Sequence, residues 1–136
     1  MREVEVDRFV AATPPEVERA LAPSSVVEYE GSFSVLDIEE GDGETVVSAG
    51  ARGLTLALRF ESTDDGLRYE QDGEAGPFDE MWTRLSWAPE NEGTRVTGRS
   101  GVSLGLPLAA VTDRVAAWKR RGELDRALRN LAEDLE

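Results

Sequence analysis

The chain has 136 residues and a formal net charge of −13, from 28 acidic and 15 basic residues. Cys and His are both absent, which excludes disulfides, thiolate chemistry, zinc fingers and every catalytic triad built on a histidine base. The negative charge argues against nucleic acid and anionic membranes as partners, because both require a positive surface. Hydrophobic residues make up 40% of the chain, too many for a disordered acidic tail, and the length predicts one domain over residues 1–136.

The first seven residues indicate the compartment. Met1–Asp7 is charged and alternating, without the apolar run of a signal peptide or of a membrane span, so we expect a cytoplasmic protein. Lys119 is the only lysine among the basic residues. A GC-rich genome explains the missing lysines but not the excess of acids, which suits concentrated salt, where repulsion is screened within about 3 Å at 1 M. We therefore expect a halophilic archaeal source.

The N-terminal part reads as a strand followed by a capped helix. Valines alternate with acidic residues over Glu3–Val10, which predicts a half-buried strand. The motif Thr13-Pro14-Pro15-Glu16 then combines an N-cap, proline in the first turn and a capping-box glutamate, which is a specific signal for a helix start. Pro23 ends this helix, and Ser24 is positioned to cap a further short turn.

The middle of the chain changes to a period of two. Short alternating segments are separated by turn signals such as Gly41-Asp42-Gly43 and Asp64-Asp65-Gly66, with a looser connection over 73–77. Six successive strands joined by short turns predict an antiparallel meander. The predicted strands cover residues 29–38, 45–51, 54–61, 67–71, 78–87 and 94–102.

The C-terminal part, residues 107–135, has helical periodicity. Leu108, Val111, Val115 and Trp118 recur at spacings of three and four. Gly122 interrupts this apolar stripe, which resumes displaced at Leu124, Leu128, Leu131 and Leu135. A helix of this span is about 40 Å long, so it must lie across a large apolar surface, and only the sheet provides one.

This order of elements resembles the START-like helix-grip superfamily, also called SRPBCC or polyketide cyclase/dehydrase-like. The resemblance rests on Phe9–Val17, which is similar to the family's first strand and its Ala/Pro-rich start of the first helix, and on Pro107–Leu131, which looks like its long helix. It implies an α+β fold in which a curved antiparallel sheet of about seven strands wraps around the C-terminal helix, with short helices after the first strand. It also implies an apolar cavity between sheet and helix, which binds a hydrophobic ligand in many relatives.

In such a fold the concave strand faces and the inner face of the helix line the cavity. One interpretation is an apolar ligand pocket with polar groups from Tyr69, Gln71 and the indole nitrogens. The alternative is that these side chains simply fill the core. The candidates by residue parity are Tyr29, Phe33, Leu56, Leu58, Tyr69, Gln71, Trp82, Val111, Val115 and Trp118.

The strand over 78–87 allows two orientations. If Phe78, Trp82 and Ser86 point inward, so do Glu80 and Arg84, which could form a buried ion pair aimed at a ligand. If the opposite face points inward, Met81, Leu85 and Trp87 are core residues and the charges lie on the surface. The surface version is favoured, because buried charges are costly.

No catalytic motif is present. With no His or Cys, a general acid or base would have to be a carboxylate such as Glu80 or Glu70, a tyrosine or Lys119. Asp113 and Arg114, like the run Lys119-Arg120-Arg121, are expected on exposed flanks of the helix. Neither acidic loop, 39–44 or 64–65, has the spacing of a calcium site. We therefore predict no catalytic residue, no metal site and no cofactor.

Three functions remain open. The first is binding of a small hydrophobic ligand (a lipid, an isoprenoid or an aromatic polyketide-like molecule) by a monomer or homodimer without nucleic-acid binding or membrane insertion. The second is a polyketide cyclase/dehydratase-like enzyme that uses a cavity carboxylate or tyrosine. The third is a protein-interaction module of the chaperone-activator kind. The lack of His and Cys favours the binder over the enzyme.

Overall fold

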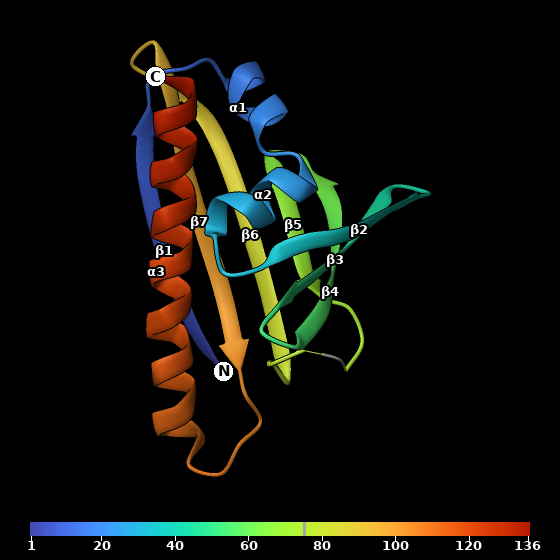
Figure 1. Ribbon diagram of the computed structural model, residues 1–136. Helices are drawn as coiled ribbons and strands as arrows, with labels where there is room; N and C mark the ends of the chain where they lie inside the picture. Colours follow the sequence, from blue (N-terminus) through green and yellow to red (C-terminus); the bar gives the residue numbers. More distant parts are fainter. Residues whose placement is uncertain (75) are drawn as a thin grey trace.

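A seven-stranded antiparallel sheet forms one layer of the protein, and three helices lie against one of its faces (Figure 1). The computed structural model describes residues 1–74 and 76–136. The strand order is β1-β7-β6-β5-β4-β3-β2, so the chain runs as a meander from β2 to β7 and β1 pairs with the last strand. The predicted α+β helix-grip fold is confirmed. In chain order the elements are β1 (Arg2–Val10), α1 (Pro14–Ala20), α2 (Pro23–Glu30), β2 (Ser34–Gly41), β3 (Glu44–Ala51), β4 (Leu54–Thr63), β5 (Gly66–Gln71), β6 (Glu80–Glu90), β7 (Gly93–Ser103) and α3 (Ala109–Leu135).

The predicted capping box starts α1. The Thr13 hydroxyl accepts from the Glu16 backbone N–H at 3.3 Å, and the Glu16 carboxylate accepts from the Thr13 N–H at 3.5 Å. Pro14 occupies the first helical position, where the missing N–H has no intrahelical partner to lose. Val17 is thereby turned into the core.

The second helix is longer than the short turn predicted for it. Pro23 does not only end α1 but also begins α2, again at the first helical position, and Gly31 ends α2 with a left-handed φ of 78°. The predicted strand over 29–38 is therefore wrong at its start, since β2 begins at Ser34. Tyr29 lies on α2 rather than on a strand.

The meander confirms the predicted turns and decides the orientation of β6. Met81, Thr83 and Leu85 are buried, so the inward face is the one that leaves Glu80 and Arg84 on the outside. Arg84 pairs there with Asp65 at 3.0 Å. The predicted connection over 73–77 includes Ala75, which lies outside the described residues.

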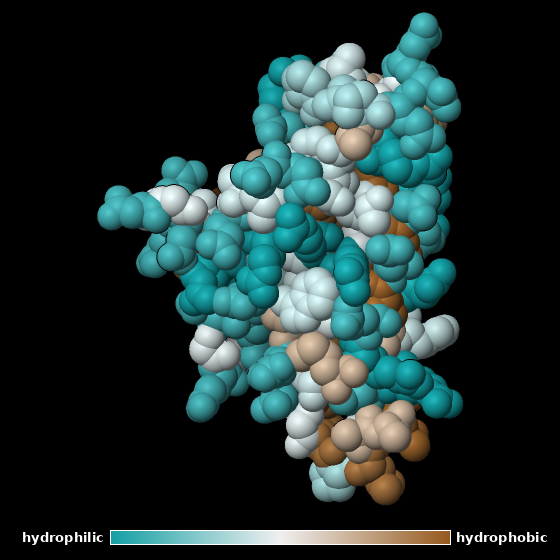
Figure 2. Space-filling view, turned by 180° about the vertical axis from the view of Figure 1, so that it is seen from behind, coloured by the Kyte–Doolittle hydropathy of each residue, from teal (hydrophilic) through white to brown (hydrophobic). Residues whose placement is uncertain are grey.

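The long helix α3 faces the sheet with its C-terminal stripe. Leu124, Leu128 and Leu131 are almost completely buried, whereas Val111, Val115 and Trp118 are exposed. At about 3.6 residues per turn the two stripes lie on opposite sides of one continuous helix, so only one can face the sheet. The prediction that Val111, Val115 and Trp118 form the inner face is wrong. Figure 2 shows hydrophobic residues gathered at the end of the molecule where β7 connects to α3.

No helix in the described part of the chain combines the length and the apolar character needed to cross a bilayer. The longest, α3, carries charged residues along its whole length.

Candidate functional site

A buried arginine is the centre of the polar interior. Arg120 projects from α3 toward the sheet and is only 3% exposed. Its guanidinium donates to the Tyr69 hydroxyl at 2.6 Å, to the Thr83 hydroxyl at 2.8 Å and to the Ser100 hydroxyl at 3.2 Å. These three acceptors come from the adjacent strands β5, β6 and β7, so one side chain ties the helix to the middle of the sheet.

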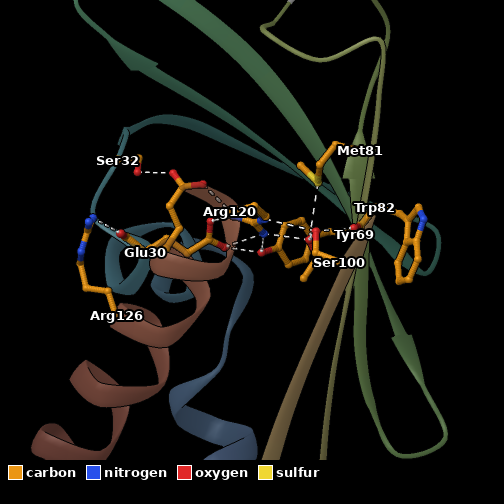
Figure 3. A network of polar contacts seen from close by, with 10 residues as sticks. Glu30, Ser32, Tyr69, Met81, Trp82, Ser100, Arg120 and Arg126 are labelled. Carbon is orange, nitrogen blue, oxygen red and sulfur yellow. Dashed lines mark hydrogen bonds and ion pairs between the residues drawn. The ribbon is translucent and has the colours of Figure 1, made fainter. Parts of the chain in front are cut away.

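Two carboxylates neutralise Arg120. Glu30, at the end of α2, forms a close ion pair with the guanidinium and also accepts a hydrogen bond from the Tyr69 hydroxyl (Figure 3). Glu123 lies one turn further along α3, 3.5 Å from Arg120, and accepts from the Ser32 hydroxyl. Among the described residues, no buried side-chain nitrogen or oxygen lacks a partner. The network is thus fully satisfied, which offsets the cost of removing these charges from water.

The electrostatics of the network keep Tyr69 and Arg120 protonated. Burial raises the pKa of Tyr69, and the neighbouring Glu30 carboxylate adds to the effect, so the phenol stays protonated. Burial by itself would lower the pKa of Arg120, but Glu30, Tyr69 and Glu123 together outweigh it and hold this pKa well above its usual value. Tyr69 is therefore a fixed hydrogen-bond donor to Glu30 and not a proton acceptor for chemistry at neutral pH.

A pocket of about 260 Å³ opens beside this network, between α3 and the loops at one end of the sheet. We refer to it as the α3 pocket. Its walls are mostly apolar, which suits a hydrophobic occupant. The lining residues are Phe33, Leu54, Pro77, Phe78, Leu104, Val115, Ala116, Lys119 and Glu123.

Lys119 and Glu123 are the charged groups of the α3 pocket. Glu123 is buried and connects the pocket to Arg120 through a direct ion pair, whereas Lys119 is exposed and belongs to the rim. A second hollow, of about 480 Å³, shares Phe33, Leu54 and Lys119 with the pocket and continues toward Ser32. The two hollows form one groove along α3, with mostly apolar walls in the α3 pocket and with the cationic residues Arg52, Lys119 and Arg126 lining the second hollow.

The whole chain matches one sequence family. The family described as "Polyketide cyclase / dehydrase and lipid transport" matches residues 1–136. The chain belongs to this family. Its fold is accordingly a polyketide cyclase/START-like ligand-binding fold.

Several solved structures share the architecture at low sequence identity. A protein from Thermus thermophilus is 22% identical with a TM-score of 0.77, covering 98% of this chain and 97% of its own. The ZhuI aromatase/cyclase of a Streptomyces species is 18% identical with a TM-score of 0.74, covering 99% and 96%. A START superfamily protein from Mycobacterium smegmatis is 14% identical with a TM-score of 0.68, covering 98% and 99%. No curated protein matches the chain by sequence.

The structure brings only part of the predicted site together. Phe33 and Val115 line the α3 pocket. Leu56, Leu58 and Tyr69 face inward from β4 and β5 but are buried in the core. Gln71 also lies on β5, where its amide donates to the Phe78 carbonyl at 2.7 Å and holds the loop that precedes β6.

Four predicted residues lie elsewhere. Tyr29 is half-buried on α2 and donates to Asp134 at 2.7 Å. Trp82 belongs to the outer face of β6 and points away from the network in Figure 3, because strand parity opposes it to Met81 and Thr83. Val111 and Trp118 lie on the side of α3 that faces away from the sheet. Contact of any of these residues with a ligand stays a prediction.

Arg120 and Asp113 were expected on exposed flanks, and both are buried. Asp113 accepts from the Leu104 N–H at 3.0 Å, and this bond lowers the pKa of its carboxyl group.

For Arg120 the sequence did carry a signal that it is buried. It precedes Leu124 by one helical turn, so extending the C-terminal stripe backward places it on the sheet side. Glu30 carries no comparable signal, because α2 was not predicted at its full length. The other pocket residues were not among the ligand-binding candidates, and of these Lys119 was considered only as a general acid or base: Leu54, Pro77, Phe78, Leu104, Ala116, Lys119 and Glu123.

Among the described residues, no three acidic side chains are grouped so that they could hold a metal ion. The groups that the α3 pocket offers to a ligand are therefore the buried carboxylate of Glu123, the ammonium of Lys119 at the rim and the apolar walls.

Proposed function

We propose that this protein binds a small, predominantly hydrophobic ligand in the α3 pocket. The observation that carries the proposal is the pocket itself, where seven apolar side chains from five separate segments converge beside one buried carboxylate. Such convergence of apolar walls with few polar groups is typical of small-molecule sites. The family description, which includes lipid transport, supports the same assignment.

The size of the pocket limits the ligand. About 260 Å³ lies just below the usual range of roughly 300–1,000 Å³ for ligand sites, so the pocket holds a small ring system or a short acyl segment. A longer molecule would extend along the groove toward Ser32, past Lys119. Glu123 accepts hydrogen bonds, which favours a ligand that carries a hydroxyl or phenol group at its buried end.

Methyl NMR during titration tests this proposal. The probes are fatty acids of graded chain length, isoprenoid alcohols and bicyclic phenols, added separately to the full chain. We expect the methyl signals of Leu54, Leu104 and Val115 to shift together with saturation. The signal of Leu135, at the opposite end of α3 from Val115, is the control. Shifts that spare the three pocket methyls for every probe would refute the proposal.

One observation favours a second function, that of a cyclase/dehydratase-like enzyme. Glu123 is a carboxylate in an apolar pocket, and its contacts to Ser32 and Arg120 hold it in place, as required of a general base. The solved relatives include an aromatase/cyclase. The test is turnover of a β-hydroxy ketone to its enone. If Glu123→Gln abolishes turnover but retains ligand binding, the enzymatic function is supported. If the unsubstituted chain shows no turnover, ligand binding alone is the function.

A further inference from the structure

The exposed side of α3 near its start has an unusual composition. Val111, Val115 and Trp118 form an outer stripe that faces away from the sheet, and Trp118 is 77% exposed. Leu106 and Leu108, in the connection from β7, add two more exposed apolar side chains at the same end of the molecule. Contiguous apolar surface of this kind marks an interaction site more often than scattered single residues do.

Cationic side chains border the outer stripe on both sides. At about 3.6 residues per turn, Arg114 and Arg121 lie along one edge of the stripe and Lys119 along the other. All three are exposed. The one acidic residue between positions 109 and 122 is Asp113, which is buried against Leu104. In a chain with a net charge of −13, the exposed charged residues of this stretch of α3 are therefore all cations, and the exposed carboxylate of Asp79 lies beside Gly105 in the connection from β7.

The backbone at Leu108 is a second, independent feature of the same surface. Leu108 adopts a left-handed conformation with φ 61° and ψ 43°, which is unfavourable for a branched side chain. Its side chain is 80% exposed, so burial in the protein does not compensate for this conformation. Contact of this side chain with an apolar phase outside the protein would compensate for the unfavourable backbone conformation.

We propose that this face, formed by Leu106, Leu108, the outer stripe, Arg114, Lys119 and Arg121, is a docking surface for an anionic lipid membrane. Apolar side chains with an exposed tryptophan between bordering arginines and lysines are the composition of helices that lie in a bilayer interface. A nucleic acid would satisfy the cations but offer nothing to the leucines and valines. A second copy in a symmetric dimer would place like charges opposite each other.

The surface is continuous with the α3 pocket, since Val115 and Lys119 belong to both. A protein docked through this face would open its pocket toward the lipid. The proposal departs from the expectation that the net charge disfavours anionic membranes, because the cations are gathered on one face. Acidic residues elsewhere do not prevent docking, since charges more than about 8 Å from the bilayer are screened at physiological salt. Docking goes beyond the proposed function, and it can be measured whether or not the pocket binds a ligand.

Vesicle co-sedimentation tests the proposal with the full chain. We expect binding to phosphatidylcholine vesicles that contain one-third phosphatidylglycerol, and at least about tenfold weaker binding to pure phosphatidylcholine. Each cation removed, as in Arg114→Gln or Arg121→Gln, is expected to lower the affinity about fivefold, which corresponds to about 1 kcal/mol per cation near an anionic surface. Arg19→Gln, an exposed arginine on α1 at the other end of the molecule, is the matched control and should have no effect.

A separate variant tests the contribution of the apolar side chains to vesicle binding. Trp118→Ser should abolish binding to the anionic vesicles, whereas Ile38→Ser, at an exposed apolar residue on β2, should not. All five substituted positions, Arg19, Ile38, Arg114, Trp118 and Arg121, are exposed, so the variants are expected to fold. Failure to bind anionic vesicles, or equal binding by Trp118→Ser and the unsubstituted chain, would overturn the proposal. So would a dimer in sedimentation velocity that Trp118→Ser dissociates, because the face would then belong to a second copy.

Discussion

The Arg120 guanidinium donates to the Tyr69 hydroxyl at 2.6 Å across the interface between α3 and the sheet. The Cζ atom of Arg120 lies 5.7 Å from the centroid of the Tyr69 ring. The same arginine is paired with Glu30 from α2. A single side chain thus links the long helix, the second short helix and the centre of the sheet, next to the wall of the α3 pocket that contains Glu123.

Removal of Arg120 should be severely destabilising. Arg120→Ala would leave Glu30 buried without its counter-charge, and breaking one partner of a buried ion pair costs about 3–5 kcal/mol. Urea unfolding measures this loss. The adjacent Arg121→Ala, at an exposed position, is the control and should change the free energy of unfolding by less than about 0.5 kcal/mol.

Arg120→Ala could fail to fold at all, so a milder variant is needed. Thr83→Val removes one acceptor of the guanidinium and keeps the shape, and it should lower the free energy of unfolding by about 1–3 kcal/mol. Equal stability of the Thr83→Val variant and the unsubstituted chain would show that the network contributes little.

Both tyrosines of the chain should titrate above their ordinary range. Partial burial, with the hydrogen bond to Asp134, raises the pKa of Tyr29 to about 12, and burial raises that of Tyr69 as well. Because these pKa values exceed the unfolded value of 10.0, their contribution to stability is complete below pH 10 and is lost as the pH rises through about 12. Near-ultraviolet absorbance follows phenolate formation, and Tyr29→Phe isolates Tyr69. Ionisation of either phenol near pH 10 in the folded protein would contradict this prediction.

Filling the mouth of the α3 pocket should block the ligand. Val115 lines the pocket and is exposed at its rim, so Val115→Trp is expected to weaken ligand binding at least about tenfold without loss of stability. Val111→Trp introduces the same bulk one turn earlier, at an exposed position that does not line the pocket, and should leave affinity unchanged. Equal effects of the two variants would place the ligand elsewhere.

The exposed pair of Arg84 and Asp65 should matter little. Both side chains are about half exposed and 3.0 Å apart on the outer face, where such pairs contribute about 0–1 kcal/mol. Arg84→Ala should therefore retain ligand affinity and lower the free energy of unfolding by less than about 1 kcal/mol. Loss of ligand affinity in this variant would require an inward role for Arg84 that its position on the outer face of β6 contradicts.

Salt should stabilise the protein. The net charge of −13 gives the compact state a repulsive energy that screening removes, and the exposed ion pairs that salt weakens are individually small. We expect the urea midpoint to rise steadily up to about 1 M KCl, where the screening length is about 3 Å. A midpoint that falls with KCl would show that the surface ion pairs dominate.

Periodicity and turn chemistry were sufficient to predict the order of the elements. The capping box at Thr13, the alternation of Leu56, Leu58 and Phe60, and the turn at Gly41-Asp42-Gly43 are local signals, and each agrees with the structure. A local signal is reliable when the backbone conformation depends on neighbouring residues only. The start of β2 was wrong because Pro23 can either end one helix or begin another, and residues 24–30 must pack against α3 for the second to form.

The sequence by itself therefore determined the fold class, the family resemblance and the exclusion of histidine and cysteine chemistry. It could not determine which side of α3 is buried, because the helix carries two apolar stripes and only the shape of the sheet decides between them. That choice buries Arg120 with Glu30 and Tyr69, and it turns Val111, Val115 and Trp118 outward. The net charge of −13 is a property of the composition, but its distribution depends on the tertiary structure, which leaves the start of α3 with exposed cations alone.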